Sequence, residues 1–517
     1  MQNLPIGMQS FEAVRNANYL YVDKTKHLER LVTTNKYYFL SRPRRFGKSL
    51  FLSTLKAYFL GKKELFKGLY IETVEKDWTE YPVIYLDLNS GIYTTEEELY
   101  RVLNYPMQRL EEKYSIDVKE PSLSVRLKNI VLTAFEQTGK QVVILVDEYD
   151  KPLISTLDNE ELHNKYKTIL KGFYSILKEC DEYIRLGFLT GVTKFSKISL
   201  FSDLNNLKDI SLDENYTDIC GITEEELKAN FKEHLQAFAE KEETTSEDIL
   251  QRLKAMYDGY HFSKVTKKDI YNPFSLLNSL TDFDFRNYWY QTGTPTFLVK
   301  LLQENDYDLK DFSQSNLSAF AEDLSSKETM HNEPIALFYQ AGYITIKDYD
   351  EELQSYTLGY PNKEVEQSFL KFLLPKYMNN NDSRSPIYVL NLYKNLRDGR
   401  LEEFLESLKV FFASTPYDLI KNTENHYQTI IFIICKLLGY YSEAEYKIVN
   451  GRIDMLIKTK DYIYVFEFKF DKSAKEALEQ IDSKDYPLPF QQDERKLYKI
   501  GINFSSETKN IDEYIIQ

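Results

Sequence analysis

Near its N-terminus the chain reads Tyr38-Phe-Leu-Ser-Arg-Pro-Arg-Arg-Phe-Gly-Lys-Ser-Leu-Phe-Leu-Ser-Thr-Leu-Lys56. The apolar residues 37–40 predict a short strand, and the leucines after the loop predict an amphipathic helix. Between them the loop closes with Gly47-Lys48-Ser49. Glycine lets the backbone approach an anion, the helix N-terminus points N–H groups at it, lysine reaches the outer phosphates, and serine can ligate Mg²⁺. This order of parts predicts a phosphate-binding loop.

The loop departs from the general pattern G-x-x-x-x-G-K-[ST] at one position. That pattern places a glycine at position 42, where this chain has Arg42. The strand before the loop and the helix after it still favour an ATP site. The predicted nucleotide-binding residues of this stretch are Arg45, Phe46, Gly47, Lys48, Ser49 and Leu50.

Length and composition bound the class of protein. A chain of 517 residues is too long for one core and predicts roughly two to four domains. The net charge of −15 argues against a protein that coats nucleic acid, but it allows a local basic groove. The three cysteines are far apart, the longest apolar run (residues 430–435) is short, and no secretory signal is evident. We therefore expect a cytoplasmic protein without a membrane span.

Strands alternate with helices over the first 200 residues. Strands are predicted at 37–40, 83–88, 142–146 and 185–190, with helices at 96–114 and 123–137 between them. This alternation predicts a parallel α/β sheet that helices cover on both faces.

The pattern changes after residue 223. Helices are predicted at 224–241, 246–257, 273–280 and 296–303, and then a helix with a hairpin (342–346 and 354–358) suits a winged-helix unit. Residues 379–386 form the clearest linker. Helices at 389–395, 401–413 and 422–438 precede strands at 446–449, 453–458, 462–470 and 499–504. The predicted domains are 1–215 (ATPase), 216–330 (helical lid), 331–378 (winged-helix-like) and 385–517 (a separate α/β domain).

Two acids end the predicted strand Val142-Val-Ile-Leu-Val-Asp-Glu148. In P-loop ATPases the first acid, here Asp147, holds Mg²⁺, and the next, here Glu148, polarises the attacking water. A core strand that merely ends in solvated acids is the alternative. The next strand ends in hydroxyl residues, so Thr193 or Thr190 is a candidate sensor of the γ-phosphate.

Together these segments resemble the predicted AAA-ATPase-like family of bacterial proteins. The resemblance rests on residues 41–49, Asp147-Glu-Tyr-Asp-Lys-Pro152, Leu189-Thr-Gly-Val-Thr-Lys-Phe-Ser196 and Tyr257-Asp-Gly-Tyr260. It covers about residues 5–280, and arginine at position 42 is usual in that family. It implies a P-loop fold of the additional-strand type with a helical lid and a winged helix.

A second group of chemical residues lies in the last hundred residues. Asp454 precedes the strand Tyr462-Ile-Tyr-Val-Phe-Glu467-Phe-Lys469-Phe, on which Glu467 and Lys469 point to one face. Two carboxylates and the carbonyl between Glu467 and Lys469 would form an oxygen site for Mg²⁺, and Lys469 would orient or deprotonate a water. If that face were exposed, the alternation would be that of an ordinary amphipathic strand.

The arrangement is similar to the PD-(D/E)xK nuclease superfamily over about residues 400–517. The resemblance implies that Asp454 and Glu467 bind the metal, that Lys469 is catalytic, and that Gln480 is a positioning residue. Glu424 would be an accessory metal ligand, although Glu443 or Glu445 could take that role.

Three functions follow as hypotheses. ATP hydrolysis could control a Mg²⁺-dependent nuclease. Alternatively, the ATPase could be a slow signalling switch, for example in defence, whose output is the nuclease domain. The C-terminal fold could also be an adaptor that binds nucleic acid or protein without cleaving. DNA or RNA is the expected partner, and the winged-helix-like region could serve a protein partner or a second copy of the chain. The acidic residues of its turn, Asp348, Asp350, Glu351 and Glu352, argue against contact with DNA there.

Overall fold

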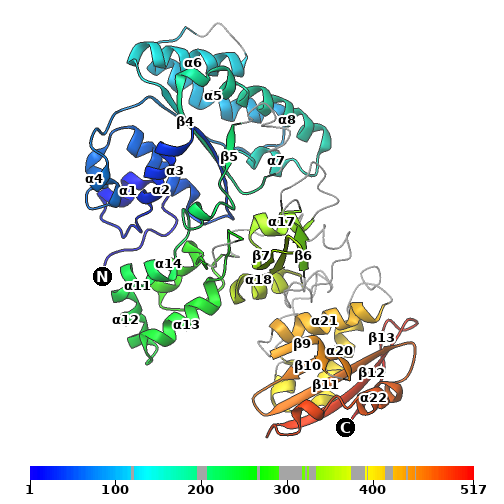
Figure 1. Cartoon of the computed structure of the whole chain (residues 1–517). Coiled ribbons are helices and arrows are strands. Elements are labelled where there is room, and N and C mark those ends of the chain that lie inside the picture. Colours follow the sequence, from blue (N-terminus) through cyan, green and yellow to red (C-terminus); the bar gives the residue numbers. More distant parts are fainter. Residues whose placement is uncertain are drawn as a thin grey trace. The chain divides into compact units, whose positions relative to one another are not determined.

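The protein is described here from a computed structural model (Figure 1). It describes residues 1–117, 122–194, 206–264, 268–289, 317–320, 323–324, 334–373, 391–392, 394–413, 423–437, 441–448 and 450–517. The chain forms two compact units. The first contains the described residues of 1–304 and 315–365, and the second contains the described residues from 366 onward. Within the described residues, no helix has the length and apolar character needed to cross a membrane.

A five-stranded parallel sheet is the centre of the first unit. Its order is β2-β3-β4-β1-β5. The strands are β1 (Tyr37–Ser41), β2 (Val83–Asp87), β3 (Val142–Asp147), β4 (Ile184–Gly191) and β5 (Leu207–Asp209). Every residue of β1 and β3 is buried, as expected for parallel strands covered on both faces. The predicted α/β fold is therefore confirmed. β4 lies between β1 and β3, which is the additional strand that the family resemblance implies.

Helices connect the strands of this sheet along the chain. The amphipathic helix expected after the loop is α3, which packs against β2, β3 and β4. The helical elements of this part are α1 (Phe11–Asn16), α2 (Thr25–Thr34), α3 (Lys48–Phe59), η1 (Lys63–Phe66), α4 (Tyr70–Val74), α5 (Glu96–Lys113), α6 (Leu123–Thr138), α7 (Lys151–Ser155), α8 (Glu160–Tyr174), α9 (Ile176–Glu179), η2 (Asp181–Tyr183) and η3 (Glu214–Tyr216).

Four helices follow and share a core with Leu4 and Leu20 of the N-terminal segment: α11 (Glu224–Asn230), α12 (Lys232–Lys241), α13 (Ser246–Tyr257) and α14 (Pro273–Asp282). The single helix predicted over 224–241 is wrong, because the chain bends at Phe231. The Phe231 ring is fully buried with Leu227 and Phe238, so the bend turns both short helices toward the same core. The helix predicted at 296–303 lies outside the described residues.

A small antiparallel sheet completes the first unit, with the order β6-β8-β7. Its elements are β6 (Leu317–Phe320), α17 (Pro334–Ala341), β7 (Thr345–Asp350), β8 (Ser355–Gly359) and α18 (Lys363–Leu373), the last of which continues into the second unit. The tip of α17 touches the phosphate-binding loop, since a Cβ at Gly342 would lie 2.6 Å from the Pro43 side chain. The assignment as a winged helix and the four domain boundaries remain predictions, and the expected linker at 379–386 lies outside the described residues.

The second unit contains a mixed sheet of order β13-β12-β11-β10-β9. All pairs are antiparallel except β11 with β12. Its elements are α20 (Leu401–Ala413), α21 (Glu424–Leu437), β9 (Tyr441–Ile448), β10 (Gly451–Lys458), β11 (Tyr462–Phe470), α22 (Ala474–Ser483), η8 (Leu488–Phe490), β12 (Lys496–Ser505) and β13 (Asn510–Ile516). The sequence analysis did not predict β13. Of the helix expected at 389–395, residues 391–392 and 394–395 are described and are helical, and the other three lie outside the described residues.

Candidate functional sites

The loop between β1 and α3 has the backbone of an anion site. Gly47 is the N-cap of α3 and has φ +92°, a conformation that side chains disfavour. A Cβ there would meet nothing within 4 Å, so the backbone angle is what requires glycine. Arg45, two residues earlier, also has a positive φ of 68°. The loop therefore presents the N-terminus of a twelve-residue helix to whatever lies beyond Gly47.

Arg42, which stands at the position of the missing glycine, is a structural residue. Its guanidinium is 1% exposed and donates to the carbonyl oxygens of Ser41, Ser211 and Tyr216. It also lies 4.1 Å from the ring centroid of Phe262. Burial lowers the pKa of Arg42. Its side chain thus anchors the segment after β5 to the loop, a role that the sequence motif did not indicate.

Lys48 lies against its own loop. Its amino group donates to the carbonyl oxygens of Arg42 (3.0 Å) and Pro43 (3.2 Å), and it lies 3.7 Å from Glu148 Oε1. The side chain is 4% exposed. The lysine expected to reach the outer phosphates and the acid expected to polarise the attacking water are thus in contact with each other.

The turn after β3 holds the acids in place. Thr190 Oγ1 donates to Asp147 Oδ1 at 2.6 Å, and Asp147 is 2% exposed. Glu148 has φ +53°, which is unusual for a residue with a side chain and is typical of functional sites. Tyr149 N–H donates to the carbonyl of Thr190, on the neighbouring strand β4. The end of β3 is thereby tied to the end of β4.

Asp150 is a buried organiser of the same turn. Its carboxylate accepts hydrogen bonds from the backbone N–H groups of Val192 and Thr193 and from Thr193 Oγ1, the last at 2.6 Å. Burial and the neighbouring charge of Glu148 raise the pKa of Asp150 to about 6. The hydroxyls of both candidate sensor threonines, Thr190 and Thr193, are thus engaged by aspartates of this turn. The sequence analysis missed Asp150, because nothing in the local pattern shows that it faces β4.

A cavity of about 300 Å³ opens in front of the loop. Its charged lining residues are one acid, Glu148, and four bases: Arg44, Arg45, Lys48 and Lys151. The predicted nucleotide-binding residues from Arg45 to Leu50 all line it, whereas Asp147 and Thr193 are buried outside its lining. The other lining residues are Pro5, Gly7, Met8, Gln9, Asn89, Pro273, Phe274 and Leu277.

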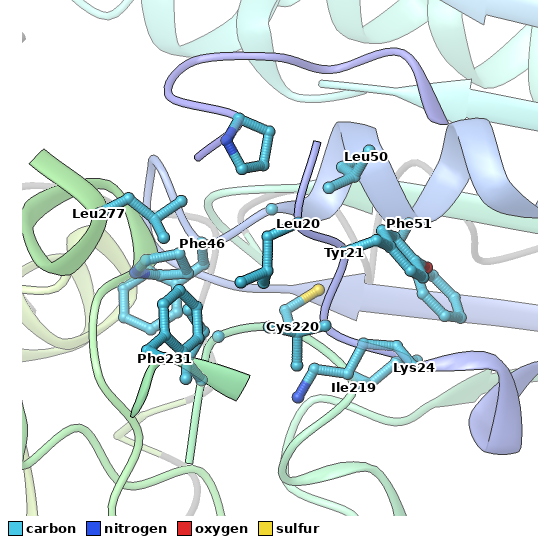
Figure 2. Close-up of a pocket in the computed structure, with 16 residues that line it drawn as sticks. Leu20, Tyr21, Lys24, Phe46, Leu50, Phe51, Ile219, Cys220, Phe231 and Leu277 are labelled. Carbon is cyan, nitrogen blue, oxygen red and sulfur yellow. The ribbon is translucent and has the colours of Figure 1, made fainter. Parts of the chain in front are cut away.

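A smaller, apolar cavity of about 90 Å³ adjoins the first and shares six lining residues with it: Pro5, Phe46, Gly47, Leu50, Pro273 and Leu277. Figure 2 shows Leu20, Phe46 and Cys220 gathered around it from three separate segments of the chain. The two longest polar side chains of its wall are engaged elsewhere. Tyr21 OH bonds Thr54, and Lys24 donates to both carboxylate oxygens of Glu226. The cavity therefore offers an apolar surface beside a cationic one.

In the second unit, two strands bring three predicted residues together. Asp454 lies on β10, and Glu467 and Lys469 lie on β11, which pairs antiparallel with β10. Asp454 Oδ2 accepts from the backbone N–H of Phe468 at 2.8 Å, and Lys469 Nζ donates to Glu467 Oε1 at 2.9 Å. Lys469 Nζ also donates to the Phe468 carbonyl at 3.1 Å. The amino group thus binds two of the three oxygens expected to surround a metal ion.

This face of the sheet is buried, which rejects the alternative of an exposed amphipathic strand. The side chain of Glu467 is 1% exposed and that of Lys469 is 12% exposed. Burial and the nearby Asp454 raise the pKa of Glu467 to about 8, and burial also raises the pKa of Asp454. The pKa of Lys469 rises despite its burial, because Glu467 accepts its hydrogen bond. A lysine held as a cation is suited to orienting a water more than to removing its proton.

Two helices support these strands. Gln428 of α21 donates to the backbone carbonyl of Asp454 at 2.7 Å, and Gln480 of α22 donates to the hydroxyl of the buried Tyr486 at 3.2 Å. Sequence reasoning missed Gln428 and Tyr486, since single polar residues on apolar helix faces carry no signal of their partners. Glu424 opens α21, and its charge raises the pKa of Glu467. The side chains of its competitors, Glu443 and Glu445, lie outside the described residues.

The residues present fit a divalent cation only in part. In the described portion of the chain, no cluster of three Asp, Glu, His or Cys side chains is close enough to hold a metal ion. Glu467 Oε2, however, is buried and has no hydrogen-bond partner among the described residues. An unpaired buried carboxylate oxygen beside a second carboxylate suits a hard cation that keeps several waters, such as Mg²⁺.

Comparison with known proteins matches a family model to each of the two regions that contain these residues. A family model described as "Predicted AAA-ATPase" matches residues 5–201, and the model of the PD-(D/E)XK nuclease superfamily matches residues 422–514. An "Uncharacterized protein in vnfD 5'region" of Azotobacter chroococcum mcd 1 is 34% identical over 533 residues, which cover 100% of this chain and 99% of the relative.

Among solved structures, the ORC2 protein of Aeropyrum pernix, described in ADPNP–ADP complexes, aligns with 68% of this chain and 88% of its own. Its sequence identity is 12% and its TM-score is 0.25, a likeness too low to carry an argument. The two family models and the full-length relative are enough to assign the family. The chain belongs to the family of predicted AAA-ATPases that carry a C-terminal domain of the PD-(D/E)XK nuclease superfamily.

Proposed function

We propose that the first unit binds and hydrolyses ATP and that this step controls a Mg²⁺-dependent nuclease in the second unit. The observation that carries the first half is the cavity of about 300 Å³ at the phosphate-binding loop, with four basic residues and one acid in its wall. Its charge complements a triphosphate, and Glu148 would accept a proton from the attacking water. The water oxygen would bond to the γ-phosphorus while the bond to the bridging oxygen of the β-phosphate breaks, which releases ADP.

The apolar cavity in Figure 2 suits the base of the nucleotide. It adjoins the phosphate cavity, and its wall includes residues from the N-terminal segment and from α14, such as Leu20 and Leu277. A flat apolar base would bury its faces there while the phosphates remain among the cations. Ser49 and Asp147 supply the hydroxyl and carboxylate oxygens that would hold Mg²⁺, which when bound neutralises charge on the phosphates.

Phosphodiester cleavage is the activity best supported for the second unit. The buried grouping of Asp454, Glu467 and Lys469 on two paired strands carries this proposal. Asp454 and Glu467 would hold Mg²⁺, which when bound stabilises charge on the scissile phosphate. Lys469 orients a water for attack on the phosphorus as the bond to the leaving sugar oxygen breaks. Gln480, held by Tyr486, would help to position the substrate, and Glu424 would add an outer ligand.

A slow nucleotide switch is the second candidate, and one contact favours it. Glu148 lies 3.7 Å from Lys48, so the acid is engaged until phosphate draws the lysine away. Under this view nucleotide binding alone releases Glu148, and hydrolysis ends the active state. The region 331–378, proposed as a winged-helix-like unit, would then contact a protein partner, because its turn is acidic.

The test uses the full chain with Mg²⁺, with and without ATP, on single- and double-stranded DNA and RNA. Lys48→Ala should abolish ATP binding, and nucleic-acid-stimulated hydrolysis would support the coupled enzyme. A stably bound nucleotide with negligible turnover would support the switch. If the protein binds every nucleic acid and cleaves none at any metal concentration, the adaptor hypothesis replaces the nuclease.

A further inference from the structure

Of the four basic residues that line the phosphate cavity, Lys151 is the one that lies outside the phosphate-binding loop. It is the first residue of α7 and follows Glu148 by three positions. Within the described residues its amino group makes no ion pair or hydrogen bond, unlike Lys48, which contacts Glu148 and two loop carbonyls. Arg45, in turn, lies 5.0 Å from the ring centroid of Phe274. Lys151 is thus a partly buried cation in the lining of the phosphate cavity.

The backbone at Lys151 is held firmly. Its N–H donates to the carbonyl of Glu148, and Asp150 before it is tied to Val192 and Thr193 of the β4 end. Pro152 after it occupies the first turn of α7, where its fixed φ suits a helix start. The strained φ of Glu148 belongs to the same turn. These contacts hold the backbone of Lys151 in place relative to that of Glu148.

The charged groups near Lys151 favour an anion beside it. Burial lowers the pKa of Lys151, and the neighbouring guanidinium of Arg44 lowers it further, whereas Glu148 and Asp150 oppose that change. Arg44 and Lys151 both line the cavity and repel each other, and a phosphate between them would reduce that repulsion. A negative group bound in the cavity would therefore favour the charged form of Lys151.

We propose that Lys151 binds the terminal phosphate of ATP from the side of Glu148 and so distinguishes ATP from ADP. The proposal rests on the proposed ATPase function. Because Lys151 shares its turn with Glu148 and lines the same cavity, it would reach the phosphate that the attacking water approaches. It would stabilise the charge that gathers on the terminal phosphate as the bond to ADP breaks, as a cation supplied in cis.

The experiment compares Lys151→Met, Lys151→Gln and Lys151→Arg with the full wild-type chain. The probes are ADP and the β,γ-imido analogue of ATP, each with Mg²⁺, and the rate of phosphate release from ATP. We expect Met and Gln to weaken binding of the ATP analogue by at least about 10-fold, to leave ADP binding within about 2-fold, and to lower kcat by about 10²-fold. Arginine should restore most of the selectivity. Lys165→Ala, on the exposed face of α8, is the matched control and should change nothing.

The outcomes separate this inference from the function on which it rests. If the wild type binds and hydrolyses ATP, Lys48→Ala loses both, and Lys151→Met keeps the wild-type ratio of affinities and kcat, Lys151 has no such role. If the wild type binds neither nucleotide, the ATPase proposal itself fails. A melting temperature for each variant excludes unfolding as the cause, and either neutral variant alone is sufficient should the other not fold.

Discussion

The two candidate sites use a lysine in a similar way but in opposite electrostatic surroundings. Lys48 binds the carbonyl oxygens of its own loop and approaches Glu148, and Lys469 binds Glu467 and the carbonyl of Phe468. The first lysine lies at the edge of a cavity of about 300 Å³ where bases outnumber acids. The second lies among acids on a buried sheet face.

The difference shows how one protein builds binding sites for ions of opposite sign. At the phosphate-binding loop, a positive φ and a helix N-terminus create an anion site from backbone, and the added cations face an open cavity. At the second site, carboxylates must leave water before any metal arrives, so burial raises the pKa of Glu467 to about 8. The first site is set by local geometry, whereas the second keeps an unfavourable burial that a cation would offset.

The largest expected effect is at the second site. Lys469→Ala removes the cation that contacts both Glu467 and Phe468, and we expect cleavage to fall by at least about 10³-fold with an unchanged fold. The measurement is the rate of nucleic-acid cleavage with Mg²⁺, beside circular dichroism. Lys475→Ala, an exposed lysine on α22, is the control. Full activity in Lys469→Ala would remove the nuclease assignment and with it one side of the comparison.

A smaller loss is expected at the first site. Glu148→Gln keeps the shape of the turn but removes the base, so ATP hydrolysis should fall by about 10²-fold or more while ATP binding persists. Binding is followed by calorimetry and hydrolysis by phosphate release. Glu160→Gln, at the start of α8, serves as the control. Hydrolysis at the wild-type rate would show that Glu148 merely neutralises Lys48.

Glu467→Gln measures how much the buried carboxyl group of Glu467 lowers the stability of the folded protein at high pH. The folded-state pKa of Glu467, about 8, exceeds its ordinary value of 4.5, so its contribution to stability is present below about pH 4.5 and is lost as pH rises through 8. Without metal, Glu467→Gln should therefore raise the melting temperature by a few degrees at pH 8.5 and much less at pH 5.

Scanning calorimetry over that pH range tests the result, with the exposed Glu479→Gln as the control. The same variant should lose any stabilisation by Mg²⁺. An equal effect at both pH values would mean that Glu467 is charged in the folded protein without metal, and the contrast with the first site would weaken.

The smallest effect is expected at the acidic hairpin. Asp350 is exposed at the end of β7, and reversal of its charge by Asp350→Lys should change DNA affinity by less than about 2-fold. Fluorescence anisotropy at fixed salt measures this affinity, since phosphate contacts depend strongly on salt. A large gain would indicate that nucleic acid passes near the hairpin as well as the second site.

Much of both sites follows from neighbours in sequence. Gly47, Lys48 and Ser49 form their loop through local backbone geometry, and the alternation of a strand suffices to put Glu467 and Lys469 on one face. The four longer strands of the parallel sheet could also be predicted from sequence, because continuous apolar runs of that kind must be buried. The three-residue β5 and the C-terminal β13 were not, because short or amphipathic edge strands lack such a run.

By itself the sequence determined the order of a strand, an anion-binding loop and a helix, and a strand with paired charges, because these depend on contacts within a few residues. Tertiary structure alone decided that Arg42 holds the segment after β5, that Asp150 clamps the end of β4, and that Lys151 faces the cavity. It also decided that the face of Glu467 is buried. These depend on which distant segments pack together, and a side chain's burial and partners arise only from that packing.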